Sequence, residues 1–122
     1  MMRKTVGVMA VLTCAVIALT AAGGAGADPS ERRASCGYQQ LGSTYNYSIT
    51  ARRTSCDKAR AVAKAFTKCR KQNGGANGHC NSPVKRFDCG EDRYDANEFQ
   101  YSSDVVCRRN LKKVKFSYTQ NT

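Results

Sequence analysis

The one histidine of the chain, His79, is the first candidate for acid–base chemistry, and carboxylates follow it within twenty residues. Hydrolysis of RNA recruits two groups, because one must accept a proton while another donates one. A pairing of His79 with Glu91 or Glu98 therefore makes a secreted hydrolase or toxin acting on RNA an alternative function. His79 stands beside Gly78 and Cys80 in a predicted turn, where a solvated loop histidine is the simpler interpretation.

Carboxylates are concentrated in the segment Gly90–Glu98. They are Glu91, Asp92, Asp95 and Glu98. Two carboxylates on either side of a glycosidic bond could cleave it, and the same hard oxygen ligands would suit calcium. The chain has no tryptophan as a sugar platform and no EF-hand spacing, so a solvated loop is the preferred interpretation. Nucleophile and phosphate-loop motifs are also missing, and no catalytic residue is assigned.

Six cysteines beyond the amino-terminal region offer metal binding, thiol chemistry or disulfides. They are Cys36, Cys56, Cys69, Cys80, Cys89 and Cys107. Zinc sites use close pairs such as C-x2-C, and none of the spacings between these cysteines is that short. An even number of cysteines in a short exported chain indicates a disulfide framework. We therefore expect no metal, no cofactor and no free thiolate for catalysis.

The amino terminus has the features of a secretory signal peptide. A basic start precedes an apolar run over residues 6–22, and a stretch of small residues ends at Ala27. We expect cleavage after Ala27, which removes residues 1–27 and leaves no membrane span. The alternatives are an uncleaved anchor, because the run approaches the ~20 apolar residues that span a bilayer, and a lipid anchor on Cys14.

Cleavage shortens the 122 residues by 27 and leaves one domain, 36–122, behind a flexible tail, 28–35. A core of this size is marginal, so cross-links would help to stabilise it. The full chain has 20 basic and 9 acidic residues, and loss of Arg3 and Lys4 leaves 18 basic residues and a net charge of +9. This excess favours anionic partners, although it is also typical of solvated faces that maintain solubility.

Two groups of cations could bind such partners. One group lies on the outward side of a predicted helix and contains Lys58, Arg60, Lys64, Lys68 and Lys71. The other lies in a carboxyl-terminal hairpin and contains Arg108, Arg109, Lys112, Lys113 and Lys115. If the helix and the hairpin occupy opposite layers, they form two separate patches. Dense lysine and arginine neutralise phosphate-rich polymers and release counterions, so binding would depend steeply on salt.

The first cation group requires a helix over about residues 56–71. Thr54 or Ser55 would cap it, and Asp57 would lie in its positive first turn. Small or apolar residues recur at spacings of three and four and would face a core. They are Cys56, Ala59, Val62, Ala63, Phe66 and Cys69. The glycine-rich segment Gln72–Gly78 would end the helix.

Alternating residues predict four strands. They are Tyr45–Ala51, Val84–Cys89, Phe99–Arg108 and Lys113–Tyr118. In the strand over 45–51, one face would carry Tyr45, Tyr47, Ile49 and Ala51. In the strand over 99–108, one face would carry Phe99, Tyr101, Ser103, Val105 and Cys107. In the strand over 113–118, the inward face would carry Val114, Phe116 and Tyr118. The order β-α-β-β-β implies an α+β fold, in which one amphipathic helix packs on a small antiparallel sheet.

Many disulfide connectivities fit this order. Cys69 and Cys80 flank the turn after the helix, and a bridge closing a loop of about 12 residues is worth ~3 kcal/mol. This pairing is our first expectation. Cys56 with Cys89, and Cys36 with Cys107, are the pairings expected for the rest.

The segment Ile49–Val62 resembles a motif in small secreted cysteine-rich proteins of actinobacteria. The residues that carry the resemblance are Ile49-x-Ala51-Arg52-x-x-Ser55-Cys56-x-x-Ala59. The similarity continues through the aromatic-x-Cys sequence ending at Cys89 and the Cys107 region, and it covers most of residues 36–118. It implies an extracellular location and the fold above, but no activity. The segment Gly90–Glu98 is more acidic than that pattern.

These features together predict a secreted, small, basic interaction module without enzymatic activity. Its expected partner is an anionic cell-envelope polymer or an extracellular protein, and nucleic acid is a further candidate. Besides the RNA hydrolase, a second alternative is a protease-inhibitor-like scaffold that presents Gly90–Glu98 as a loop between disulfides.

Overall fold

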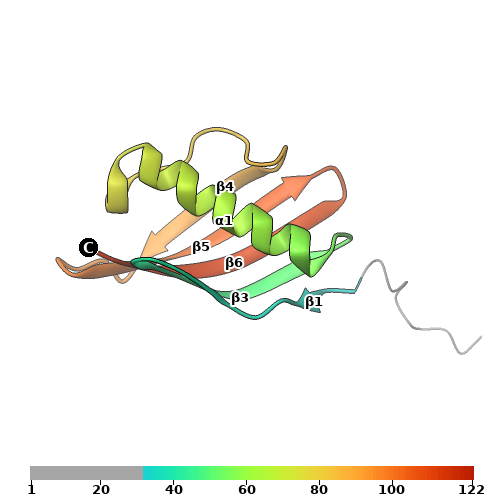
Figure 1. The fold of residues 1–122 in the computed structure, drawn as a ribbon, viewed down its shortest axis with the longest axis horizontal. Coiled ribbons are helices and arrows are strands. Elements are labelled where there is room, and N and C mark those ends of the chain that lie inside the picture. Colours follow the sequence, from blue (N-terminus) through green and yellow to red (C-terminus); the bar gives the residue numbers. More distant parts are fainter. Residues whose placement is uncertain (1–31) are drawn as a thin grey trace, which may run out of the picture.

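The computed structural model describes residues 32–122, in which one long helix lies across an antiparallel sheet (Figure 1). The strands are β1 (Ala34–Ser35), β2 (Gln39–Leu41), β3 (Thr44–Arg52), β4 (Asp88–Tyr94), β5 (Gln100–Arg109) and β6 (Lys112–Asn121). The helix α1 (Cys56–Gln72) is followed by the short 3-10 helix η2 (Gly75–Asn77). The predicted α+β fold is confirmed, with two short edge strands added before β3.

The predicted signal peptide and residues 28–31 of the predicted tail lie outside the described residues. Ala34–Ser35 of that tail form β1, which pairs with the end of β3. Within residues 32–122, no helix combines the length and the apolar character needed to cross a membrane.

The sheet has the strand order β1-β3-β6-β5-β4, and β2 pairs with the first half of β3. All of these pairings are antiparallel. The long strand β6 therefore lies between β3 and β5, and α1 crosses one face of this central part (Figure 1).

Helix α1 begins where its capping signals predict. The Ser55 side chain accepts a hydrogen bond from the Lys58 amide at 3.1 Å, and Asp57 lies in the first turn. The helix buries Ala59, Val62, Ala63, Phe66, Thr67 and Arg70. The apolar side was thus predicted correctly in its middle, whereas Cys56 and Cys69 at its two ends are only partly buried and Arg70 is fully enclosed.

Strand β3 contains a bulge that the alternation pattern missed. Ser48 has a positive φ of 51°, and the register with β6 shifts between Tyr47 and Thr50. A bulge adds one residue to a strand and so exchanges the two faces on one side of it. The prediction that Tyr45 and Tyr47 point inward with Ile49 is therefore wrong. Before the bulge the buried residues are Thr44 and Asn46.

The predicted second strand starts too early. Val84 and Phe87 exchange two backbone hydrogen bonds around Lys85 and Arg86, which both have positive φ. These four residues form a tight turn, and β4 begins only at Asp88. The strand then runs to Tyr94, so most of the segment expected to be an exposed loop is paired with β5.

The two carboxyl-terminal strands were predicted well, because their alternation is unbroken. Tyr101, Ser103, Val105 and Cys107 of β5 are buried, as are Val114, Phe116 and Tyr118 of β6. Phe99 is the exception, since it lies before β5 and is 71% exposed. The Phe66 ring of α1 packs edge-on against Phe116 at 5.7 Å between ring centroids.

Three disulfides join the six cysteines of residues 32–122: Cys36–Cys56, Cys69–Cys80 and Cys89–Cys107. The Cys69–Cys80 prediction is confirmed, and the other two predicted pairings are wrong. Cys89 and Cys107 are register partners on neighbouring strands. The Cys36 amide donates to the Ile49 carbonyl at 2.7 Å, which holds it beside β3 and within reach of the helix start.

Candidate functional site

The sheet has one face packed against α1 and one face that α1 does not cover, which we call the open face (Figure 1). Alternation along each strand decides which side chains it carries. After the bulge, Thr50 and Arg52 of β3 are on this face, together with Lys113 and Lys115 of β6 and Arg108 of β5. The buried residues between them face α1.

A row of cations crosses the open face near the β5–β6 turn. Arg52 is the register partner of Lys113, which pairs in turn with Arg108. Arg33 directly precedes β1, which pairs with the end of β3, and it extends the row on that side. Neighbouring strands lie about 4.8 Å apart, so these four backbone positions span roughly 14 Å. With Lys115, two residues along β6, they form what we call the cation cluster.

The positive charges of the cation cluster are not balanced by ion pairs within residues 32–122. Partial desolvation lowers the pKa of Lys113 from its ordinary value, and the surrounding positive charges lower it further. Those charges belong to Arg108, Lys115, Arg33 and Arg52. Among residues 32–122, no ion pair neutralises any of the five side chains. Asp88 is opposite Arg108 at the end of the row, and it is not within ion-pair distance of that side chain.

The cations predicted on the helix do not act as one group. Lys64 and Lys68 are exposed and Lys58 is partly exposed. Arg60 donates to the Cys36 carbonyl at 2.8 Å, and Lys71 donates to the Leu41 carbonyl at 3.1 Å. These two side chains therefore tie the β1–β2 segment to α1.

The cations predicted on the hairpin divide between the two sides of the sheet. Arg108, Lys113 and Lys115 lie on the open face, whereas Arg109 and Lys112 alternate to the other side at the β5–β6 turn. Helix and hairpin cations thus form separate patches. Sequence reasoning missed Arg33 and Arg52. Extending the predicted alternation of residues 45–51 by one residue would have placed Arg52 on the face away from the helix. Its proximity to Arg33 and Lys113 depends on strand pairing, which the sequence pattern does not give.

A shallow groove of about 360 Å³ adjoins the cation cluster on the open face. Its lining residues include Arg33, Ser48, Thr50, Asp104, Val106, Lys115 and Ser117. The Asp104 carboxylate accepts from the Ser117 hydroxyl at 2.6 Å. The groove therefore carries cations on one side and a carboxylate on the other, with hydroxyl groups between them.

Tyrosines occupy the open face beyond this groove. The Tyr45 ring lies 5.5 Å from the Tyr38 ring and 5.9 Å from the Tyr47 ring, measured between centroids. The Tyr94 hydroxyl donates to Asp104 at 3.4 Å. A hydrogen bond with Tyr47, followed by burial and the nearby Asp104 charge, raises the pKa of Tyr94 to about 12. We call these four side chains the tyrosine group.

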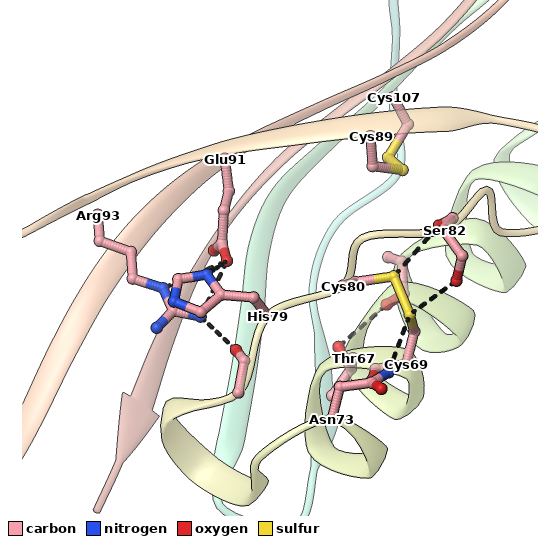
Figure 2. Close-up of a disulfide and its surroundings, with 12 residues drawn as sticks. Thr67, Cys69, Asn73, His79, Cys80, Ser82, Cys89, Glu91, Arg93 and Cys107 are labelled. Carbon is pink, nitrogen blue, oxygen red and sulfur yellow. Dashed lines mark hydrogen bonds and ion pairs between the residues drawn. A yellow bond between two sulfur atoms is a disulfide. The ribbon is translucent and has the colours of Figure 1, made fainter.

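The predicted pair His79 and Glu91 does meet, on the side of the sheet that faces α1. The His79 Nδ1 atom lies 3.5 Å from a Glu91 carboxylate oxygen that also accepts from Arg93 at 2.9 Å. Figure 2 shows the His79 ring and the Arg93 guanidinium side by side, both reaching Glu91. Arg93 also donates to the carbonyls of Asn77 and Gly78, which anchors the η2 turn to β4.

The Glu91 carboxylate is fully engaged by these contacts. Its second oxygen accepts from the Ser103 hydroxyl at 2.8 Å and from the Tyr118 hydroxyl. Burial raises the pKa of Glu91, but the hydrogen bonds from Tyr118, Arg93 and Ser103 together lower it below its ordinary value. A general base needs a lone pair directed at a substrate, and this side chain is only 11% exposed. Its contacts are those of a structural residue that joins β4 to Ser103 of β5 and Tyr118 of β6.

Among the carboxylates of the segment Gly90–Glu98, Asp92 has another carboxylate opposite it, because it is the register partner of Asp104 on the open face. Glu91 faces α1 while Asp92 is exposed on the opposite side of β4. Asp95 and Glu98 lie in the short exposed loop between β4 and β5. Within the described residues, no three His, Cys, Asp or Glu side chains are grouped as metal ligands. The loop expected to span Gly90–Glu98 is reduced to residues 95–99.

Three disulfides in so short a chain indicate folding in an oxidising environment. No protein-family model, no curated protein and no solved structure matches the chain.

Proposed function

We propose that the protein is an exported, non-catalytic binding module that holds an anionic polymer of the cell envelope through the cation cluster. The observation that carries this proposal is the row Arg33–Arg52–Lys113–Arg108, which strand pairing builds across the open face. Arg33, Arg52 and the hairpin pair Arg108 and Lys113 come from three separate parts of the sequence, so the fold itself concentrates their charge.

The spacing of the row favours a polymer over a single ion. The backbone positions of neighbouring cations are about 4.8 Å apart by strand geometry, well within the screening length of ~8–10 Å at ordinary salt. Their mutual repulsion is therefore largely unscreened, and a chain of anions along the row would relieve it at several points. Such binding releases counterions, so its affinity falls steeply with salt.

Both the amino-terminal sequence and the disulfides support export. The signal sequence predicts removal of residues 1–27, and the disulfides need an oxidising compartment. We expect the intact mass of protein from culture medium to correspond to a chain beginning at Asp28 with three disulfides. An unprocessed chain with free thiols would contradict export.

The binding test compares two variants that each remove two positive charges. In the first, Arg108→Gln and Lys113→Gln neutralise the cation cluster; in the second, Lys64→Gln and Lys68→Gln neutralise the exposed helix. Secreted protein is loaded on isolated cell walls of the producing organism and eluted with rising salt. The cluster variant should elute at clearly lower salt, with about tenfold weaker binding, and the helix variant should elute like wild type. Equal elution of the two variants, or elution indifferent to salt, would refute the proposal.

A further inference from the structure

We propose that the polymer on the open face is an acidic polysaccharide, whose charged substituents bind the cation cluster while its sugar hydroxyls and rings occupy the groove and the tyrosine group. This inference rests on the proposed function and adds the chemical class of the ligand. Three features of the open face carry it.

The first feature is that the groove continues the cation cluster. Lys115 and Arg33 belong to both, and the hydroxyls of Ser48 and Thr50 line the groove beside them. An anionic substituent held by the two cations would also receive hydrogen bonds from these neutral donors. The groove is therefore suited to a carboxylate, sulfate or phosphate attached to a larger uncharged unit.

The second feature is the Asp104 carboxylate on the opposite side of the groove. It is exposed, and it accepts from Ser117 and Tyr94. A carboxylate only accepts hydrogen bonds, so the part of the ligand that lies there must donate them. A polymer that has only charged links and no hydroxyl groups would be repelled at this point, whereas the ring hydroxyls of a charged sugar would donate to Asp104.

The third feature is the tyrosine group, which begins where the groove ends. Tyr94 is joined to the groove through Asp104, and Tyr47 is the register partner of Ser117. Tyrosine offers an apolar ring face with a polar tip, which fits the apolar C–H face and the hydroxyl rim of a sugar ring. From Lys113 to Thr119, the partner of Tyr45, β6 covers about 20 Å, enough for several sugar units.

The test compares three polyanions on immobilised secreted protein: alginate, which has uronate rings and hydroxyls; linear polyphosphate, which has neither; and poly(U). Alginate should bind most tightly at equal charge concentration. Asp104→Asn should weaken alginate binding and strengthen polyphosphate binding, because the same carboxylate accepts from one ligand and repels the other. Tyr94→Ala should weaken alginate binding by about tenfold and leave polyphosphate within about twofold. Phe99→Ala, an exposed aromatic outside the tyrosine group, is the matched control.

The outcomes separate this inference from the function on which it rests. If alginate and polyphosphate bind equally and both respond only to Arg108→Gln with Lys113→Gln, the sugar assignment is overturned and the anionic-polymer function stands. If poly(U) binds more tightly than alginate, the ligand is a single-stranded nucleic acid and the sugar assignment is likewise overturned. If no polyanion responds to the cation cluster, both proposals fail. Circular dichroism and unchanged disulfides would verify that each variant is folded.

Discussion

Arg70 and Tyr118 form a stacked pair in the core, with the guanidinium carbon 4.1 Å from the centroid of the tyrosine ring. Both side chains are fully buried. The Tyr118 hydroxyl donates to Glu91, so a buried cation and a largely enclosed carboxylate are connected through one aromatic residue. Beneath the last turns of α1, the core therefore contains a polar network beside the apolar contacts of Phe66.

Arg70 should be intolerant even of lysine. Its guanidinium donates to the Tyr101 hydroxyl at 2.9 Å and to the Gln120 side chain at 3.0 Å, and no carboxylate within residues 32–122 forms an ion pair with it. Lysine cannot reproduce this planar fork, so Arg70→Lys should lower the free energy of unfolding by ~2–4 kcal/mol. Urea denaturation of the disulfide-intact protein measures this. Arg109→Lys, at the β5–β6 turn, should change stability little; equal stability of both variants would contradict the network.

Glu91 should make the fold sensitive to acid. Its folded-state pKa lies below the ordinary carboxyl value of 4.5, so the ionised form stabilises the fold above that pH. The contribution is lost as the pH falls through the lowered pKa. Glu91→Gln should therefore cost ~1–3 kcal/mol near pH 7, and its deficit relative to wild type should shrink as the pH approaches 2.5.

Thermal unfolding between pH 2.5 and pH 7 measures this difference. Glu98→Gln, which removes an exposed carboxylate in the loop between β4 and β5, is the control for the loss of one negative charge. A Glu91→Gln deficit that does not vary with pH would show that the carboxylate acts by shape rather than by charge.

Gly78 should be irreplaceable because of close backbone approach. A Cβ atom there would lie 2.0 Å from the Arg70 carbonyl oxygen and 2.8 Å from the Asn73 carbonyl oxygen. Gly78→Ala must displace the turn after α1, and we expect a loss of several kcal/mol, at least ~2. Gly90 has no atom within 4 Å of its Cβ position, so Gly90→Ala should be neutral or slightly stabilising. Equal denaturation midpoints for the two variants would contradict this contact.

His79 should matter little to stability and should not catalyse. Its side chain is 61% exposed, and its Nδ1 atom lies 3.5 Å from the Glu91 carboxylate, so His79→Ala should change stability by less than ~0.5 kcal/mol. Incubated with RNA, wild type and variant should both leave the substrate intact. Cleavage by wild type that is lost in His79→Ala would instead establish the hydrolase alternative and displace the binding module.

Local patterns were read correctly wherever a single element determines its own structure. The start of α1 depends on Ser55 and on apolar spacing within the helix, and β5 and β6 depend on unbroken alternation. The Cys69–Cys80 bridge was also predictable, since both cysteines flank one turn. Each of these features needs only residues that are near one another in the chain.

The errors arose where one residue changes the register. At Ser48 the bulge reverses which side chains of β3 face α1, and the pattern of residue types gives no sign of it. Lys85 and Arg86 adopt positive φ without glycine or asparagine, so the Val84–Phe87 turn appeared as part of a strand. The disulfide of Cys89 was mispredicted because its pairing with Cys107 follows from the register of β4 with β5, which the residue types along one strand do not indicate.

By itself, then, the sequence determined the charge, the disulfide content and the order of one helix among strands, and it predicts export, since these follow from composition and short-range periodicity. Only the tertiary structure decided that Arg33 and Arg52 join Lys113 and Arg108, and that Arg70 is buried. Strand pairing brings together residues that are distant in the chain, and which of them meet depends on the register of several strands at once. The candidate binding face is a product of that register.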